Sequence, residues 1–415
     1  MFFFLRLAFG NIIKNRRNSL TILIAVFISV FFMEITTGYM DGFKLKLLKE
    51  GLDVAGHVKI YNKLYKENMD FSPIEYNVPL DKEVFDVIKA APGYKDSRAE
   101  INFGVIAGTG DLSQETLVKA VDLSKKDGVY AARVKNIIEG SYPQKDNEIA
   151  VGYKMAKVLN VKTGDSIVMF GLDSYGSMNA VEGVVTGIFN NFNPPEDEKL
   201  VLCSLGLAQS LLGIEGTATE IFINTQTAEG SVAAAEYIKK NLPEDYIALP
   251  WQDEQPMLVY AFTMMDVATF IICAIILLAA AFGIVNSFLM NIMGRMPEFG
   301  VLRAMGVSKS QLIMMIISES FVLGLIGTIA GMLPSTWLVW FFQQNPISYE
   351  KMGDMMESMG GIDALIGTAL VPSSYITVFV TGVLISVLAS LYPAFSAARK
   401  KTVDILRCLN EKQKF

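Results

Sequence analysis

The sequence predicts a membrane α-helical protein with four transmembrane helices and a large α+β extracytoplasmic domain inserted between helices 1 and 2. Two observations predict this class. Hydrophobic residues make up 52% of the 415 residues and charged residues only 19%, which is too apolar for an ordinary soluble chain. The apolar residues also concentrate near the start and in the last third, whereas the middle has the composition of a soluble domain.

Four segments are long and apolar enough to cross a bilayer, which takes roughly 20 mainly apolar residues. They are residues 19–39, 257–293, 311–342 and 374–396. The second includes Asp266 near its start and has no further charged residue before Arg295. At about 1.5 Å per residue this helix exceeds a hydrocarbon core of about 30 Å, so we expect it to tilt or to extend beyond the bilayer. The first run is too long for a signal-peptide core and lacks a cleavage site, so we expect an uncleaved anchor.

Basic residues flank the spans unevenly, and this asymmetry predicts the orientation. Arg6, Lys14, Arg16 and Arg17 precede span one. Arg295, Arg303 and Lys309 lie between spans two and three, and Arg399, Lys400, Lys401 and Arg407 follow span four. We therefore expect an amphipathic N-terminal helix (1–18), a helix at 294–310 and a tail at 397–415 in the cytoplasm. Residues 40–256 and the loop 343–373 are expected outside.

The extracytoplasmic domain shows strand and helix patterns in turn. Residues 220–225 alternate as a strand does, residues 233–242 have a helical pattern, and a second strand follows, so this part is βαβ-like. Acidic residues are scattered, and no catalytic or metal-binding constellation is seen. His57 is the single histidine, and a lone histidine is expected to be structural or exposed. The net charge of −6 gives no indication of nucleic-acid binding, and no P-loop sequence occurs.

The segment 291–312, NIMGRMPEFGVLRAMGVSKSQL, combines charged residues with small ones. Arg295 and Glu298 are three residues apart and can pair on one helical face. A loop that only sets topology would need no small residues here, whereas small residues suit close docking. The pattern R-x-x-E-x-G-x-x-R-A-x-G resembles the coupling helix of permeases of the MacB/FtsX/LolCDE superfamily. The resemblance implies that a cytoplasmic ATPase docks on Arg295, Glu298, Gly300, Arg303, Ala304 and Gly306.

The resemblance extends over nearly the whole chain. The opening LAFGNIIKNRRNSLTIL and the end YPAFSAARKKTVDILR are similar to those of the superfamily, except that Thr402 stands where a proline is common. Short matches at residues 40–43 (MDGF), 56–60 (GHVKI) and 250–252 (PWQ) resemble the lipoprotein-releasing LolC/LolE branch. The loop by which that branch recruits its carrier is not located in this sequence.

The resemblance implies a mechanotransmission subunit of the bacterial inner membrane, with both termini cytoplasmic, that releases lipoproteins to a periplasmic carrier. A separate ABC ATPase dimer would bind ATP and Mg, so this chain would bind no cofactor and catalyse no reaction. A second permease copy or a paralogue would complete the complex in membrane lipid. The substrate is expected to contact apolar residues near the outer ends of spans one and two, namely Met40, Phe43, Met257, Tyr260, Phe262, Met264 and Met265.

Two alternative functions stay open at this point. One is MacB-like export of drugs, toxins or peptides from the periplasm. The other is FtsX-like regulation of cell-wall hydrolases.

Small residues recur along spans three and four at spacings suited to close helix packing. They are Gly324, Gly327, Gly331, Gly382, Ser386 and Ser390, which we expect to pack helices within one chain. Three acidic residues would be costly in lipid, namely Glu34, Asp266 and Glu319. Each lies near a span end or faces the bundle, and a direct contact with substrate stays open for all three.

Overall fold

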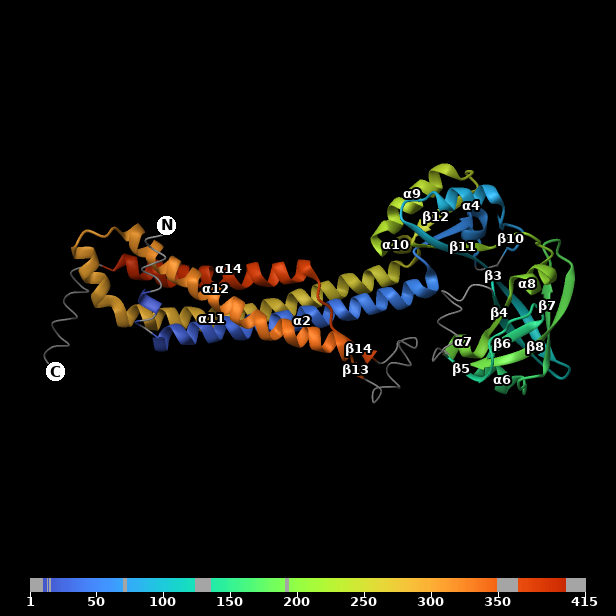
Figure 1. The fold of residues 1–415 in the computed structure, drawn as a ribbon, viewed down its shortest axis with the longest axis horizontal. Coiled ribbons are helices and arrows are strands. Elements are labelled where there is room, and N and C mark those ends of the chain that lie inside the picture. The colour runs from blue at the N-terminus through green and yellow to red at the C-terminus, as the bar shows by residue number, and fades with distance from the viewer. Residues whose placement is uncertain are drawn as a thin grey trace. The chain divides into compact units, whose positions relative to one another are not determined.

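The computed structural model divides into two compact units (Figure 1). The helical unit comprises residues 1–45, 261–348 and 365–415, and the α+β unit comprises residues 46–260 and 349–364. The structure describes residues 10–12, 14, 16–69, 73–123, 136–190, 194–348 and 365–400. Most of the predicted N-terminal helix at 1–18 and nearly all of the predicted tail at 397–415 therefore lie outside the described residues.

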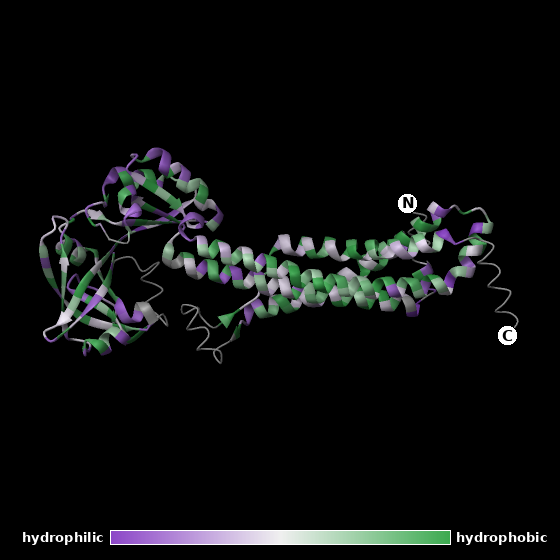
Figure 2. Ribbon diagram, turned by 180° about the vertical axis from the view of Figure 1, so that it is seen from behind, coloured by the Kyte–Doolittle hydropathy of each residue, from purple (hydrophilic) through white to green (hydrophobic). Residues whose placement is uncertain are grey.

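Among the described residues, four long helices are apolar enough to cross a membrane: α2 (Arg16–Ala55), α11 (Pro256–Ala304), α12 (Lys309–Gln344) and α14 (Pro372–Arg399). Figure 2 shows hydrophobic residues along most of their length and hydrophilic residues where α11 passes into α12. The α+β unit lies between the first and second of these helices in sequence. The predicted fold class is thus confirmed, and the chain is a multi-pass membrane protein.

The helices extend beyond the predicted spans. α2 continues past residue 39 to Ala55, and α11 is a single helix of 49 residues. The predicted separate helix at 294–310 is wrong in its boundaries, because residues 294–304 are the last turns of α11 and only 305–308 connect it to α12. Hydropathy falls at a membrane surface, but backbone hydrogen bonding can continue into water, so composition does not mark the end of a helix.

Small residues bring α12 close to α2 and α14. A Cβ added at Gly324 would lie 2.7 Å from the side chain of Ser386 on α14. A Cβ added at Gly327 would lie 2.9 Å from the side chain of Val26 on α2. A Cβ added at Gly331 would lie 2.8 Å from the carbonyl oxygen of Phe27, also on α2. The other two members of the predicted set are also buried, namely Gly382 and Ser390. These contacts pack helices within the chain, since only a missing side chain allows such approach in lipid.

The α+β unit contains one large sheet with the order β12-β1-β11-β3-β4-β9-β6-β8-β5, and β7 pairs with β3 and β8. Its strands are β1 (Val58–Asn62), β3 (Tyr94–Thr109), β4 (Leu112–Val121), β5 (Ile137–Gly140), β6 (Glu148–Gly152), β7 (Ser166–Leu172), β8 (Met178–Phe189), β9 (Leu200–Ser204), β11 (Glu220–Thr225) and β12 (Tyr246–Pro250). A small pair is formed by β2 (Val78–Pro79) and β10 (Thr217–Ala218). In the helical unit, β13 (Ile347–Ser348) pairs with β14 (Leu365–Ile366) before α14 begins.

Short helices cover the sheet: α3 (Lys63–Glu67), α4 (Lys82–Lys89), α6 (Tyr153–Val158), α7 (Pro194–Lys199), α8 (Leu205–Leu212), α9 (Ser231–Asn241) and α10 (Trp251–Glu254). One core packs α4 and α9 against β1, β11 and β12, and a second core lies around β3 to β9 with α6 and α8. The predicted strand, helix and strand near residues 220–250 are present. However, β1 inserts between β11 and β12 and runs antiparallel to both, a long-range pairing that no local pattern shows.

Candidate functional site

Arg295 lies in a buried polar cluster between the end of α11 and the start of α12. Only 7% of its side chain is exposed. Its Nη1 donates to both carboxylate oxygens of Glu319 on α12, at 3.1 and 2.8 Å, and its guanidinium lies 5.2 Å from the ring centroid of Phe299. A buried charge is stable only when it is matched by a partner. Glu319 supplies that partner and so joins α11 to α12.

The predicted contact between Arg295 and Glu298 is present, but it is longer than the contact between Arg295 and Glu319. Glu298 Oε2 lies 3.6 Å from Arg295 Nε, beyond hydrogen-bond distance. Sequence spacing identified Glu298 because it lies on the same helix. Glu319 is 24 positions further along on another helix, and its only signal was an acidic residue in an apolar segment.

Glu298 and Arg303 attach the outer side of the same turns to other segments. Lys14 Nζ donates to Glu298 at 2.7 Å, but both side chains are largely exposed, so this pair contributes about 0–1 kcal/mol. Arg303 Nη1 donates to the carbonyl oxygen of Ala398 at the end of α14, at 3.2 Å. The last turns of α11 are therefore connected to the N-terminal segment, to α12 and to α14.

Gly306 ends α11. Its φ is +99°, its N–H donates to the carbonyl oxygen of Arg303, and the N–H of Val307 donates to that of Leu302, both at 3.1 Å. These are the two bonds of a Schellman motif, which places a glycine in the left-handed region. Gly306 therefore has a structural reason to be glycine, besides the docking role predicted for it.

The tip of α11 presents small and apolar groups. Val301, Ala304, Met305 and Gly306 are exposed, whereas Gly300 is buried. Gly300 thus packs inward, and of the predicted docking residues Glu298, Ala304 and Gly306 have the most accessible surface. An exposed apolar surface with charges beside it is typical of a protein-binding site.

A groove of about 680 Å³ lies between α2, α11 and α14, a volume within the usual range of ligand sites. Towards the middle of the helices its lining is apolar apart from Thr381: Met33, Phe270, Cys273, Ala274, Leu277, Leu278, Val378 and Ile385. Towards the C-terminal part of α2 and the start of α14 it is mainly polar: Thr37, Asp41, Lys44, Asp266, Thr269, Ser373, Ser374 and Thr377. The groove therefore suits a ligand with a hydrocarbon part and a polar part.

Two polar contacts lie at the polar end of the groove. Lys44 on α2 forms an ion pair with Asp266 on α11, and Ser374 at the start of α14 donates to Asp41 on α2. The carboxylate of Asp266 is mostly exposed, whereas only 20% of the Lys44 side chain is exposed. Asp266 is thus neutralised by a neighbouring cation, which lowers the cost of placing it near lipid.

The residues predicted to contact substrate only partly coincide with this groove. Met40 is among its lining residues, and the other six predicted residues are not: Phe43, Met257, Tyr260, Phe262, Met264 and Met265. The prediction considered spans one and two and omitted the fourth. Ser373, Thr377 and Ile385 on α14 complete the groove, and no sequence pattern indicated that α14 would pack beside α2 and α11.

Glu34 has a structural environment. It is 1% exposed and accepts hydrogen bonds from the hydroxyls of Ser335 and Thr336 on α12, at 2.7 and 2.6 Å. About two turns further along α2, Gly42 approaches the segment before α14 so closely that an added Cβ would lie 2.2 Å from the carbonyl oxygen of Gly367. This part of α2 is therefore fixed against its neighbours, and Glu34 is not among the groove-lining residues.

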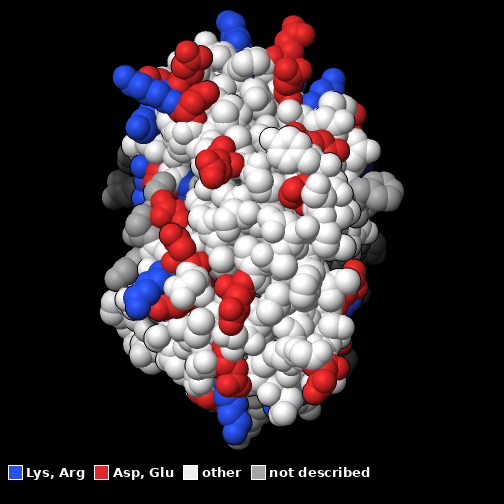
Figure 3. Space-filling view, turned by 90° about the vertical axis from the view of Figure 1, so that its right-hand side faces the viewer, with Lys and Arg blue, Asp and Glu red and all other residues white. Residues whose placement is uncertain are grey.

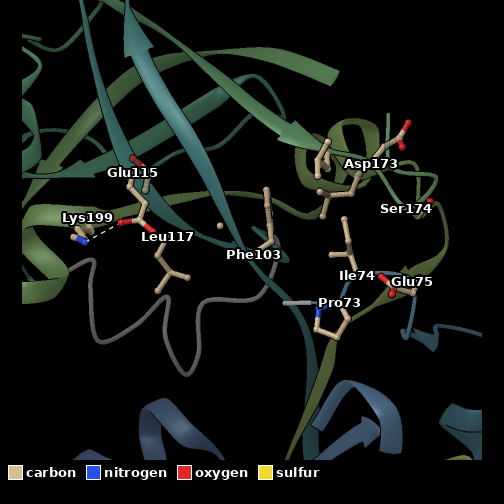
Figure 4. A pocket seen from close by; sticks show the side chains of 14 residues that line it. Pro73, Ile74, Glu75, Phe103, Glu115, Leu117, Asp173, Ser174 and Lys199 are labelled. Carbon is tan, nitrogen blue, oxygen red and sulfur yellow. Dashed lines mark hydrogen bonds and ion pairs between the residues drawn. The ribbon is translucent and has the colours of Figure 1, made fainter. Parts of the chain in front are cut away.

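A second cavity, of about 870 Å³, lies in the α+β unit beside β3 and β4. Figure 4 shows Glu115 paired with Lys199 on one side of it, at 3.2 Å, and Ile74 and Asp173 on the other, with Phe103 between them. In Figure 3 acidic and basic side chains are dispersed over the visible face without a continuous basic patch. Among the described residues no group of three or more His, Cys, Asp or Glu could hold a metal ion.

Comparison with known proteins shows which permeases this chain resembles. The family of the FtsX-like permease C-terminal domain matches residues 270–402, which include most of α11 and all of α12 and α14. This part of the chain is therefore similar to the FtsX-like permeases of ABC transporters, which are membrane subunits that work with a partner ATPase. The buried Arg295–Glu319 cluster lies within the matched residues.

Similar proteins match over almost the whole length of the chain. Lipoprotein-releasing system transmembrane protein LolC of Xylella fastidiosa is 21% identical and covers 94% of this chain and 93% of its own. An uncharacterized ABC transporter permease of Methanocaldococcus jannaschii is 24% identical, with 96% of each chain covered. The periplasmic region of MacB from Actinobacillus actinomycetemcomitans is 8% identical, covers 51% of this chain and 97% of its own, and has a TM-score of 0.36.

Proposed function

We propose that this permease is the membrane subunit of an ABC complex that releases lipid-anchored proteins from the bacterial inner membrane to a periplasmic carrier. The groove between α2, α11 and α14 carries the proposal, because one part suits hydrocarbon and the other suits a polar group. Relatives named as lipoprotein-releasing transmembrane proteins that align over most of the chain give separate support.

Recognition of such a substrate must come mainly from the polar end of the groove. Acyl chains in a bilayer are already in a medium as apolar as the groove, so moving them into it yields little free energy. Lys44, Asp266 and Asp41 instead offer charged groups to the polar part of the ligand. The ligand would then replace the ion pair between Lys44 and Asp266 with contacts of its own.

The contacts around Arg295 give a route from the partner ATPase to this groove. A force on the exposed tip of α11 acts on α12 through the pair of Arg295 with Glu319, and on α14 through the bond from Arg303 to Ala398. Both α11 and α14 line the groove. Closure of the ATPase would therefore change the width of the groove and expel its occupant.

Depletion of the protein tests the proposed function directly. Membranes of depleted cells are fractionated, and acylated lipoproteins are quantified in the inner membrane. Accumulation there is expected if the permease releases them. Normal sorting would contradict the proposal and favour MacB-like export, or FtsX-like regulation of cell-wall hydrolases if the cells also failed to divide.

Photocrosslinking tests the groove itself. A photoreactive residue at Thr377, which lines the groove, should capture acylated protein in intact cells. The same residue at Val380, which lies on α14 outside the lining and is 53% exposed, is the matched control. Equal capture at both positions would show that lipid-anchored proteins meet α14 without selection by the groove.

A further inference from the structure

Both long helices that enter the α+β unit connect directly to neighbouring strands of its sheet. α2 ends at Ala55, and β1 begins three residues later at Val58. β12 ends at Pro250 and is followed by the four-residue helix α10 and then by α11. Because β1 and β12 are hydrogen-bonded neighbours, the ends of the two helices are attached at one edge of the sheet.

Each connection contains one residue that interrupts the helix. Gly56 has φ +69° and lies between α2 and β1. Gln255 has φ −123° and ψ 64° and separates α10 from α11. The two connections are joined, since the N–H of Trp251 donates to the carbonyl oxygen of His57 at 2.9 Å. Gln255 is tied to both helices, because its N–H donates to the carbonyl oxygen of Trp251 at 2.8 Å and its carbonyl oxygen accepts from the N–H of Leu258 at 3.0 Å. α10 and the start of α11 can therefore move as one piece unless side chains hold α10 on the sheet.

Glu254, the last residue of α10, is held by three side chains from β1 and α3. One carboxylate oxygen accepts from the hydroxyl of Tyr61 at 2.6 Å and lies 3.6 Å from Lys59 Nζ. The other accepts from Lys66 Nζ at 2.8 Å. The ring of Tyr61 lies under the Lys66 ammonium, 4.8 Å from it. Only 10% of the Glu254 side chain is exposed, so water screens these contacts weakly.

The electrostatics keep this group of residues in its charged and hydrogen-bonded form. Burial acts to raise the pKa of Glu254, but hydrogen bonds from Lys66 and Tyr61, together with the charge of Lys59, lower that pKa overall. Burial, with the charges of Glu220 and Glu254, raises the pKa of Tyr61 well above its usual range, so its hydroxyl stays a donor. Lys59 also lies 3.5 Å from Glu220 on β11, which extends the contacts to the next strand.

We propose that Glu254, held by Tyr61, Lys66 and Lys59, is a clamp that transmits movement of α11 to the sheet of the α+β unit. Glu254 is two residues before Pro256, where α11 begins. With the clamp closed, a tilt of α11 must carry β1 and its neighbours with it. With the clamp open, α10 moves away from β1 together with α11, and the tilt is absorbed at the junction between β12 and α10. This inference rests on the proposed function in taking α11 as the element that the ATPase moves.

Distance measurements between spin labels test the clamp. Labels are placed on α9 and α11, at Y237C and V267C, two exposed positions, after the three native cysteines are replaced by alanine. The permease–ATPase complex in lipid nanodiscs is measured without nucleotide and with ATP and vanadate. The wild type should give a narrow distance distribution that shifts with nucleotide. The variants E254Q and K66M should broaden the distribution and reduce the shifted fraction roughly tenfold, as expected for a lost charged hydrogen bond.

Two control variants distinguish a clamp from general loss of structure. Asp253 precedes Glu254 but is exposed, so D253N changes the same charge without the contacts and should behave as wild type. K66R keeps a cation at position 66 and should preserve the shift. Wild-type width and shift in both E254Q and K66M would overturn the clamp. A wild type that does not respond to nucleotide would instead contradict the proposed function, while broadening in E254Q would still support the clamp.

Discussion

Replacing Glu319 by glutamine is expected to destabilise the helical unit, because it leaves the Arg295 guanidinium buried without its carboxylate. Both side chains are almost inaccessible, at 7% and 2% exposure. Water therefore cannot solvate the remaining charge. The replacement keeps the size of the side chain, so the loss of charge is the main change.

The magnitude follows from the partners that remain. Removing one member of a buried ion pair costs about 3–5 kcal/mol. Glu298 Oε2, 3.6 Å from Arg295, and the Phe299 ring still offset part of the charge. The expected cost is therefore at the lower end, about 3 kcal/mol, or roughly 100-fold in the folding equilibrium constant. Replacing both residues, as in R295M/E319M, should cost less than either single change, because no unmatched charge stays buried.

Reversible unfolding in mixed micelles, followed by tryptophan fluorescence or circular dichroism, measures these differences. The single variants E319Q and R295M and the double variant R295M/E319M are compared with the wild type. The reasoning would be refuted if E319Q were as stable as the wild type, or if the double variant were less stable than both single variants. Basal ATPase activity of the complex is measured in parallel. It shows whether a variant has lost only the Arg295–Glu319 ion pair or has also lost its binding to the partner ATPase.

Three further predictions concern other parts of the chain. Replacing Gly42 by alanine should destabilise the helical unit by about 1–3 kcal/mol in the same assay, because the added Cβ would lie 2.2 Å from a carbonyl oxygen. The matched control is alanine at Gly294, where an added Cβ would have nothing within 4 Å. This change should be neutral or slightly stabilising. The pKa of Glu254 is lowered from 4.5, so the contribution of this carboxylate to stability is present above that value and is lost as the pH falls through the lowered pKa. The difference in unfolding free energy between the wild type and E254Q should therefore be clear at pH 7 and disappear in acid. A difference that does not change with pH would contradict this. Replacing Glu298 by glutamine or Arg303 by alanine should uncouple ATPase activity from release with little change in melting temperature, and full release activity would refute a coupling role.

Local patterns predicted the parts of the fold that depend on composition over a short stretch. The four spans follow from apolar runs, and the α+β class of the middle follows from alternating and helical patterns. Helix ends were less well predicted. α11 continues through residues 294–304 because its backbone hydrogen bonds persist beyond the apolar run until Gly306 ends them.

In the candidate sites, too, only the features that depend on a short stretch of sequence were predicted. The motif at 295–306 was visible because its residues lie on one helix at fixed spacing. Of the residues predicted to contact substrate, only Met40 lines the groove, because its lining on α11 begins at Asp266, beyond the predicted residues, and the rest comes from α2 and α14. The contacts of Glu254 were not predicted at all, because they join residues 188 and 193 positions apart in sequence.

Hydropathy and periodicity are local properties of a segment, so the amino-acid sequence alone predicted four membrane-spanning helices with a folded domain between the first two. Which polar groups are matched in the interior is visible only in the folded chain. Glu319 pairs with Arg295, Glu34 with two hydroxyls, and Glu254 with Lys66. Such pairs depend on how each helix is rotated and which strands become neighbours, and those choices are fixed by packing over the whole chain.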